Sequence, residues 1–208
     1  MLYLEIKGKE APKRHIDHAI AVLQRGGLVV FPTDTGYAIG CDLYKKKSIE
    51  RIYKIKKRDS KKPLSFICQD LTSLSQYALM TNQAYRSMKK LLPGPFTFVL
   101  PATRMVPKLL VSRNSTVGIR IPDHPVSQAL VKALQHPIIV TSCTTPDDKP
   151  LEHVGDIKEC YAHQVDAIMS VDALAAEPST VVDYTQAKPR VLRKGKGDVS
   201  LIGLEDHG

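Results

Sequence analysis

Residues 25–40 read RGGLVVFPTDTGYAIG, and this stretch sets a pattern that recurs along the chain. Gly26 and Gly27 end a segment in which apolar residues follow helical spacing, and residues 28–31 are an apolar run bounded by Pro32. Glycine commonly follows the last turn of a helix, and a short apolar run between such signals is typical of a buried strand. The stretch therefore predicts a helix, a buried strand and a loop, in that order.

The alternation of helix and strand continues on the C-terminal side of this stretch. We find no internal repeat, low-complexity tract or long linker, so we expect residues 1–208 to form a single α/β domain around a mixed sheet. Further helices are expected at residues 48–57, 71–79, 83–92, 125–134 and 156–163, and further strands at residues 64–68, 97–100, 117–121, 138–141, 167–171, 181–183 and 190–192.

Length and composition exclude several classes of protein. With 208 residues, 43% of them hydrophobic, the chain can bury an ordinary core. No apolar run approaches the roughly 20 residues that a bilayer span needs, and the N-terminus MLYLEIKGKE lacks the layout of a secretory signal. The four cysteines form no C-x-x-C pair, which argues against a zinc knuckle or a disulfide scaffold. We therefore expect a cytoplasmic protein that does not contact a membrane.

Positive charge is concentrated in one segment. The net charge is +9, and residues 45–62 carry ten basic residues against Glu50 and Asp59. This segment holds eight of the nine net charges, which indicates a local anion site rather than a general coat for nucleic acid. A helix face that is simply solvated would give the same run of lysines, so charge alone leaves both interpretations open.

The loop predicted after the buried strand is rich in polar groups. Thr33, Asp34 and Thr35 come directly after the apolar run, and loops at strand ends commonly carry sites in α/β folds. A plain turn, in which Asp34 accepts local backbone N–H groups and Gly36 takes unusual dihedrals, explains the same residues. The sequence leaves a binding loop and a plain turn as alternatives.

A second polar segment follows the basic helix at residues 56–63. Lys56, Arg58 and Lys62 could converge on a triphosphate, because arginine can fork two oxygens and lysine acts as a point charge. Pro63 would fix the direction in which Lys62 projects. The chain has no G-x-x-x-x-G-K-[ST] motif, so we expect side chains, and not a P-loop, to bind phosphate.

Arg120 interrupts an apolar strand pattern. A cation in a buried strand needs an anion, either from a ligand or from an internal salt bridge to Asp123 or Asp42. His124 is a candidate base, but its place at a strand-to-helix turn favours a capping or surface role.

Five motifs, in this order and spacing, resemble the family of threonylcarbamoyl-AMP synthases, the YrdC/Sua5 family, and specifically its single-domain YciO-like branch. The resemblance runs from about residue 19 to residue 197. The motifs are Pro32-Thr33-Asp34-Thr35, the K-x-R-x-x-x-K-P pattern of residues 56–63, Pro93-Gly94-Pro95-Phe96-Thr97, Ile119-Arg120-Ile121-Pro122-Asp123-His124-Pro125 and Ser179-Thr180-Val181-Val182-Asp183.

The resemblance implies a fold and a reaction. The fold is a YrdC-like domain with its core at about residues 12–197, in which a twisted mixed β-sheet flanked by helices surrounds a positively charged cavity. The reaction is a nucleotidyl transfer that joins L-threonine, bicarbonate or CO2 and ATP into threonylcarbamoyl-AMP and pyrophosphate, with Mg²⁺ accompanying the nucleotide. A downstream threonylcarbamoyl transferase complex would then use the product for threonylcarbamoyladenosine modification of tRNA.

The resemblance also implies residue roles, none of them as a metal ligand. The catalytic residues would be Lys56, Arg58 and Arg120. The ATP-binding residues would be Lys56, Arg58, Lys62, Thr116, Ser142 and Arg193. Threonine or its carbamate would be held by Thr33, Arg120 and Ser179, with Arg120 pairing with a carboxylate.

One motif departs from the family pattern. The usual Ser-Ala-Asn triplet is Ser142-Cys143-Thr144 here, so the serine persists while the asparagine amide is lost. The intact Lys56-x-Arg58-x-x-x-Lys62 pattern argues for retained nucleotide binding, whereas the changed triplet argues for weak or altered catalysis.

Two other functions fit the same sequence. In the first, the basic segment at residues 45–62 contacts the phosphate backbone of tRNA, rRNA or double-stranded RNA, with weak or no synthase activity. Aromatic residues make up 6% of the chain and tryptophan is absent, which speaks against recognition of single strands by base stacking. In the second, the family fold serves carbamoyl transfer to another acceptor.

Overall fold

The stretch that sets the sequence pattern folds into a β-hairpin. The predicted strand is β2 (Val29–Thr33), and a second strand, β3 (Gly36–Asp42), follows it directly where the sequence predicts a loop. The two strands pair antiparallel from Val29 opposite Gly40 to Thr33 opposite Gly36. All seven residues of β3 are buried. The loop prediction is wrong because the small residues on one face of β3 do not look like those of a strand, yet close packing requires them. A Cβ on Gly40 would lie 2.6 Å from the Phe31 ring.

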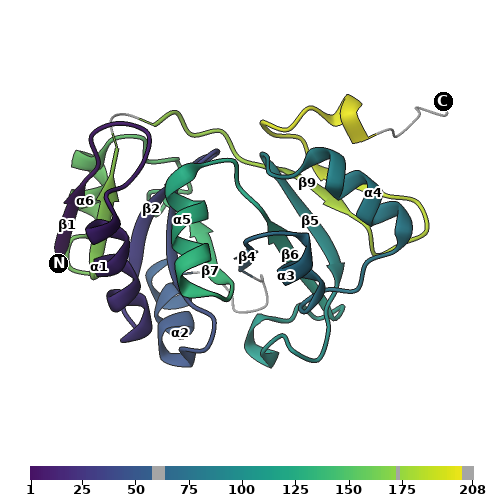
Figure 1. The fold of residues 1–208 in the computed structure, drawn as a ribbon, viewed down its shortest axis with the longest axis horizontal. Helices are drawn as coiled ribbons and strands as arrows, with labels where there is room; N and C mark the ends of the chain where they lie inside the picture. Colours follow the sequence, from purple (N-terminus) through teal and green to yellow (C-terminus); the bar gives the residue numbers. More distant parts are fainter. Residues whose placement is uncertain (58–63, 172–173, 203–208) are drawn as a thin grey trace.

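This hairpin is part of a ten-stranded mixed sheet in the order β1-β8-β2-β3-β7-β4-β6-β5-β9-β10 (Figure 1). The computed structural model describes residues 1–57, 64–171 and 174–202. The α/β fold predicted from the sequence, a mixed sheet flanked by helices, is confirmed. The other strands are β1 (Leu2–Glu5), β4 (Ser65–Ile67), β5 (Phe96–Pro101), β6 (Thr116–Arg120), β7 (Ile138–Ser142), β8 (Ala167–Ser170), β9 (Thr180–Asp183) and β10 (Arg190–Arg193).

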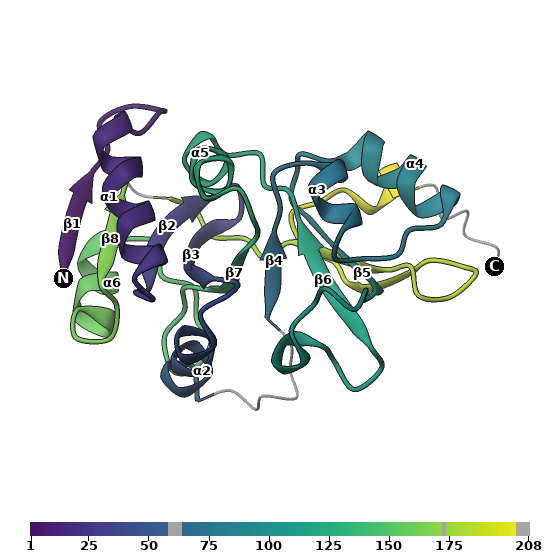
Figure 2. The same ribbon diagram turned by 60° about the horizontal axis from the view of Figure 1, so that its bottom comes forward.

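Helices cover the sheet from both sides (Figure 2). The apolar residues of α1 and α5 join Phe31, Ile138 and Val140 in one core. Those of α2 and α6 join a second, larger core on the other face of β2 and β7, and this core continues to α3 and α4 beside β5 and β6 (Figure 2). The helices are α1 (Lys13–Gln24), α2 (Lys46–Ile55), α3 (Leu71–Ser75), α4 (Asn82–Leu91), α5 (Pro125–Leu134) and α6 (Val154–Tyr161), with short 3-10 turns η1 (Lys108–Leu110) and η2 (Val199–Ile202).

The strands at the middle of the sheet are apolar on one face and polar on the other. Side chains alternate along a strand, so Val117 and Ile119 of β6 enter the larger core while Gly118 and Arg120 point to the opposite face. A Cβ on Gly118 would lie 3.5 Å from the Thr97 methyl group and 3.6 Å from the Ser65 hydroxyl. We call this surface of β4, β5 and β6 the polar face.

The helices of the described ranges are short. None of them is long and apolar enough to cross a membrane.

Candidate functional site

Strand register places three predicted site residues on or beside the polar face. Gly118 and Val140 both pair with Ser65. Thr116 lies two residues before Gly118 on β6, and Ser142 lies two residues after Val140 on the antiparallel neighbouring strand β7. Both therefore lie at the same end of the polar face, and Arg120 lies at the other end. With about 3.3 Å per residue, the four residues from Thr116 to Arg120 separate these ends by about 13 Å.

Arg120 is held by a carboxylate from the hairpin turn. Its Nη2 donates to Asp34 Oδ1 over 2.7 Å, and the two side chains are 10% and 8% exposed. The partner is thus Asp34, and the alternatives Asp123 and Asp42 are wrong as partners of this ion pair. The sequence could not select among the three acids because the hairpin turn and β6 meet only in the folded sheet.

Asp34 connects three segments of the chain through its carboxylate and its backbone carbonyl. Asp34 Oδ2 accepts the backbone N–H of Asp123 over 3.1 Å, and the Asp34 carbonyl accepts from Lys196 Nζ over 2.5 Å. Asp34 therefore ties the hairpin turn to the end of β6 and to the segment after β10. The plain-turn interpretation has the Asp34 side chain accept from nearby backbone N–H groups. Its described partners, Arg120 and Asp123, are instead distant in sequence.

Arg120 keeps a buried donor that has no partner. Its Nε is buried and has no hydrogen-bond partner. Burial lowers the pKa of Arg120, the Asp34 carboxylate opposes this, and the nearby positive charge of Arg193 lowers the pKa further. A buried cation with a spare donor is suited to a second acceptor such as a ligand carboxylate.

Arg193 and Ser179 lie beside Arg120. Arg193 donates to the Ser179 carbonyl from Nε and Nη2 over 3.1 and 2.9 Å, and Nη2 also donates to Ser179 Oγ over 3.1 Å. Ser179 Oγ is 2.7 Å from Thr97 Oγ1. The backbone comes close here as well, because a Cβ on Gly195 would lie 2.0 Å from the Pro178 carbonyl oxygen. We call Arg120, Asp34, Thr97, Ser179 and Arg193 the Arg120 cluster.

Thr33 and Thr116 use their hydroxyl groups locally. Thr33 Oγ1 donates to the Gly36 carbonyl over 2.7 Å and is buried within the hairpin turn. Thr116 Oγ1 is 2.6 Å from Ser112 Oγ, within the approach to β6. Both side chains therefore have a structural partner, and their binding roles stay predictions.

Lys56 lies at the other end of the site. It directly follows α2, and its Nζ donates to the Thr144 carbonyl over 3.3 Å, to Thr144 Oγ1 at close range and to the Tyr161 hydroxyl over 3.4 Å. Thr144 lies two residues past Ser142, at the end of β7. We call Lys56, Thr144 and Tyr161 the Lys56 cluster. Arg58 and Lys62 lie outside the described residues, so their assigned roles also stay predictions.

Several contact residues carry no sequence signal. Thr97 and Tyr161 look like ordinary members of a strand and of an amphipathic helix, and Lys196 stands in a segment that has no motif of its own. Their contacts arise from strand order and helix placement, which local patterns do not specify. The capping role of His124 was predictable: it is the N-cap of α5, and its Nδ1 accepts from the Val126 N–H over 3.2 Å.

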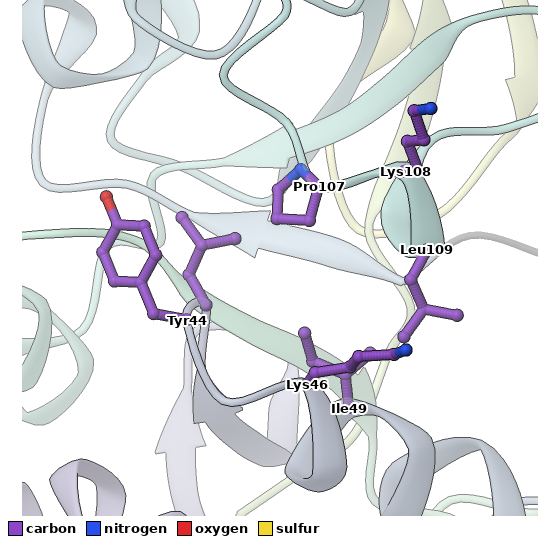
Figure 3. A pocket seen from close by; sticks show the side chains of 7 residues that line it. Tyr44, Lys46, Ile49, Pro107, Lys108 and Leu109 are labelled. Atoms are coloured by element: carbon purple, nitrogen blue, oxygen red, sulfur yellow. The ribbon is translucent and has the colours of Figure 1, made fainter.

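An apolar pocket of about 570 Å³ lies away from both clusters (Figure 3). It opens between the start of α2 and the connection from β5 to β6, and Leu43 and Ile49 in its wall belong to the larger core. Its described lining is Leu43, Tyr44, Lys46, Ile49, Pro107, Lys108 and Leu109. None of the site residues that the sequence predicts and the structure describes lines this pocket.

The described residues do not form a magnesium site. Within residues 1–57, 64–171 and 174–202, no group of three or more His, Cys, Asp or Glu side chains could hold a metal ion. Any Mg²⁺ would therefore arrive with nucleotide phosphates and water, which are common ligands of this ion.

Sequence and structure comparisons give the same relatives. The family model of Sua5, YciO and YrdC proteins, described as telomere recombination, matches residues 21–195. Protein YciO of Escherichia coli K12, described as uncharacterized, is 39% identical over 189 residues, which are 90% of this chain and 92% of that protein. The crystal structure of E. coli YciO gives a TM-score of 0.90 at 36% identity and covers 97% of this chain and 98% of that one.

Two more distant relatives carry an activity or a ligand. Threonylcarbamoyl-AMP synthase of Nitrosococcus oceani is 29% identical over 174 residues, which are 83% of this chain and 94% of that protein. Sua5 of P. abyssi, solved in complex with L-threonine, gives a TM-score of 0.83 at 26% identity and covers 93% of this chain and 57% of that one. On these grounds the chain belongs to the Sua5/YciO/YrdC family.

Proposed function

We propose that this protein is an L-threonylcarbamoyl-AMP synthase, a nucleotidyltransferase that consumes ATP, L-threonine and bicarbonate or CO2. The observation that carries the proposal is the pair of cationic clusters at two ends of one site, one around Arg120 and one around Lys56. Threonylcarbamoyl-AMP has a matching layout, because it carries a carboxylate at the threonine end and a phosphate further along. The N. oceani relative is named for this activity, and P. abyssi Sua5 binds L-threonine.

The chemistry needs positioning and charge neutralisation rather than a protein nucleophile. The threonine amine adds to CO2, or to bicarbonate with loss of water, and gives a carbamate. A carbamate oxygen then forms a bond to the α-phosphorus of ATP while the bond from that phosphorus to the leaving pyrophosphate breaks. Negative charge accumulates on the phosphates, where Lys56, Arg58 and Lys62 would act.

The Arg120 cluster would hold the amino acid. Asp34 accepts from Nη2 of Arg120, and the guanidinium has further N–H groups, so a ligand carboxylate would bind to these without displacing Asp34. Ser179 and Thr33 would contact threonine or its carbamate. Arg193 contacts Ser179 from the side of β10 and would connect the amino-acid end to the nucleotide, near Thr116 and Ser142.

The test is product formation by purified protein. With ATP, magnesium, bicarbonate and threonine we expect pyrophosphate release and threonylcarbamoyl-AMP, and omission of any one component should abolish both. A protein that binds ATP and threonine yet forms no adenylate under these conditions would contradict the proposed activity. The product would then pass to a threonylcarbamoyl transferase complex for tRNA modification.

A second candidate function, binding to RNA, is favoured by the surface of α2. Lys45, Lys46, Lys47 and Lys54 are all exposed along this one helix and its start. A phosphate backbone contacted by several lysines would give an affinity that falls steeply with salt, whereas a nucleotide held in an enclosed site would respond less. Measuring the affinity for double-stranded RNA and for ATP at several salt concentrations separates the two functions.

A further inference from the structure

The ammonium group of Lys56 has a dedicated set of acceptors. Lys56 Nζ donates to Thr144 Oγ1, to the Thr144 carbonyl and to the Tyr161 hydroxyl, so these groups hold the ammonium from one side and it would act on phosphates through its positive charge. Thr144 and Tyr161 are 8% and 5% exposed, so the acceptors belong to the packed interior and not to a mobile surface. From these contacts we infer that Thr144 and Tyr161 are positioning residues, which place Lys56 for the phosphates of ATP.

The acceptors fix one another before they meet the lysine. The Tyr161 hydroxyl donates to the Thr144 carbonyl, and Thr144 Oγ1 donates to the Thr145 carbonyl over 3.1 Å. Both hydroxyl protons thus have a backbone acceptor, which leaves oxygen lone pairs to face Lys56. Burial raises the pKa of the Tyr161 hydroxyl, so it stays protonated and keeps donating to Thr144.

The backbone on both sides of the contact is fixed as well. Thr144 lies at the neck of a short loop, where Leu151 N–H donates to the Cys143 carbonyl over 3.1 Å and Cys143 N–H donates to the Tyr37 carbonyl over 2.8 Å. On the lysine side, α2 ends at Ile55, Lys56 is its C-cap, and Lys57 takes a left-handed φ of 45°. Lys56 is therefore the last residue that the helix orients.

Neutral acceptors suit a lysine that must bind an anion. The three acceptors are uncharged groups, and the Asp148 carboxylate lies one step further out, with Oδ1 3.5 Å from Thr144 Oγ1. A free lysine side chain loses rotamer entropy when it is fixed, and placing it before ATP arrives avoids that cost during binding. In the triplet at residues 142–144, the threonine that departs from the family pattern thus has a role of its own in this chain.

The inference rests on the proposed function, and variants that remove one acceptor test it. Thr144→Val should weaken ATP binding about tenfold and Tyr161→Phe about threefold, because a hydrogen bond to a charged group is worth more than a neutral one and the tyrosine contact is long. Thr144→Ser keeps the hydroxyl and should retain wild-type affinity. Calorimetric titration with ATP, ADP, AMP and adenosine would measure these effects.

Three controls separate positioning from a merely structural role. Tyr77→Phe also removes a buried tyrosine hydroxyl, one that lies 3.4 Å from the Tyr44 hydroxyl, and should not change ATP affinity. Adenosine affinity should be unchanged in every variant, since adenosine has no phosphate. In a Lys56→Ala background, Thr144→Val should have no further effect, because the group that it positions is gone.

The outcomes distinguish the two levels of inference. No binding of ATP by the unaltered protein would overturn both the proposed function and the positioning role. ATP binding by the unaltered protein, with unchanged or tighter binding in Thr144→Val and Tyr161→Phe, would overturn the positioning role alone. Equal losses for ATP and adenosine would also overturn it, because they would show a general disturbance of the site.

Discussion

The two cationic clusters balance their charge in different ways. Arg120 is 8% exposed as a residue and faces the carboxylate of Asp34, whereas Lys56 is half-buried and faces two hydroxyl oxygens and a carbonyl. A buried ion pair fixes local structure, and the loss of one partner leaves an uncompensated charge. Neutral acceptors also fix the position of a side chain, but removing one of them costs less stability. Changes at the Arg120 cluster should therefore affect stability first, and changes at the Lys56 cluster should affect ligand binding first.

The largest expected effect on stability is at Asp34. Asp34→Ala leaves the Arg120 guanidinium buried without its carboxylate, and we expect the free energy of unfolding to fall by about 3–5 kcal/mol. Urea denaturation measures this. Asp17→Ala, which removes an exposed pair with Lys13, is the control and should change stability by less than about 1 kcal/mol.

A compensating variant sharpens this test. Asp34→Ala combined with Arg120→Met removes both charges and should recover much of the lost stability, since an apolar side chain can replace a buried ion pair. If Asp34→Ala is no more destabilising than Asp17→Ala, the ion pair does not hold the Arg120 cluster together.

Lys56→Ala should show the opposite pattern. The loss of one charged contact to phosphate is worth about 1.5–3 kcal/mol, so ATP affinity should fall by about 10-fold to 150-fold. The free energy of unfolding should change by less than about 1 kcal/mol, because the Thr144 and Tyr161 hydroxyl groups keep their own backbone acceptors when the lysine is removed. Calorimetry and urea denaturation on the same preparation give both numbers.

The matched control for this variant is on the same helix. Lys54→Ala removes an exposed lysine from the last turn of α2 and should leave ATP affinity unchanged. Equal losses of ATP affinity in both variants would mean that the charge of the whole helix matters and not the placement of Lys56. That result would favour the RNA-binding function.

Local patterns predict the elements of this fold better than its contacts. The predicted helix at residues 125–134 coincides with α5, because Pro125 follows a capping residue and apolar residues repeat at helical spacing. The sequence does not predict the hairpin strand β3, because alanine at residue 38 and glycine at residue 40 hide the usual strand pattern. The Asp34–Arg120 pair was missed because it joins residues 86 positions apart.

A smaller effect on stability is expected inside the Arg120 cluster. Thr97→Val keeps the shape of the side chain but removes the hydroxyl that lies 2.7 Å from Ser179 Oγ in a buried setting. We expect a loss of about 1–2 kcal/mol in the free energy of unfolding. Thr72→Val, at an exposed position in α3, is the control. Equal stability of the two variants would mean that the Thr97 hydroxyl does not support Ser179.

The smallest expected effect is a pH dependence from His124, which caps α5 just after the polar face. Burial lowers the pKa of His124 below the value of about 6.5 in an unfolded chain, and the Asp34 charge only partly opposes this. Between the folded-state and unfolded-state pKa values of His124, the unfolded state binds more protons than the folded state. Stability should therefore fall as the pH drops below about 6.5 and level off below the folded-state pKa. His124→Asn retains a capping side chain without a proton to bind, and its stability should vary less with pH over this range. Urea denaturation between about pH 5 and 8 measures the difference, with His18→Asn at an exposed position as the control. Parallel pH profiles for His124→Asn and the unaltered protein would mean that protonation of His124 does not disturb the turn between β6 and α5, and that the Arg120 cluster next to it tolerates another positive charge.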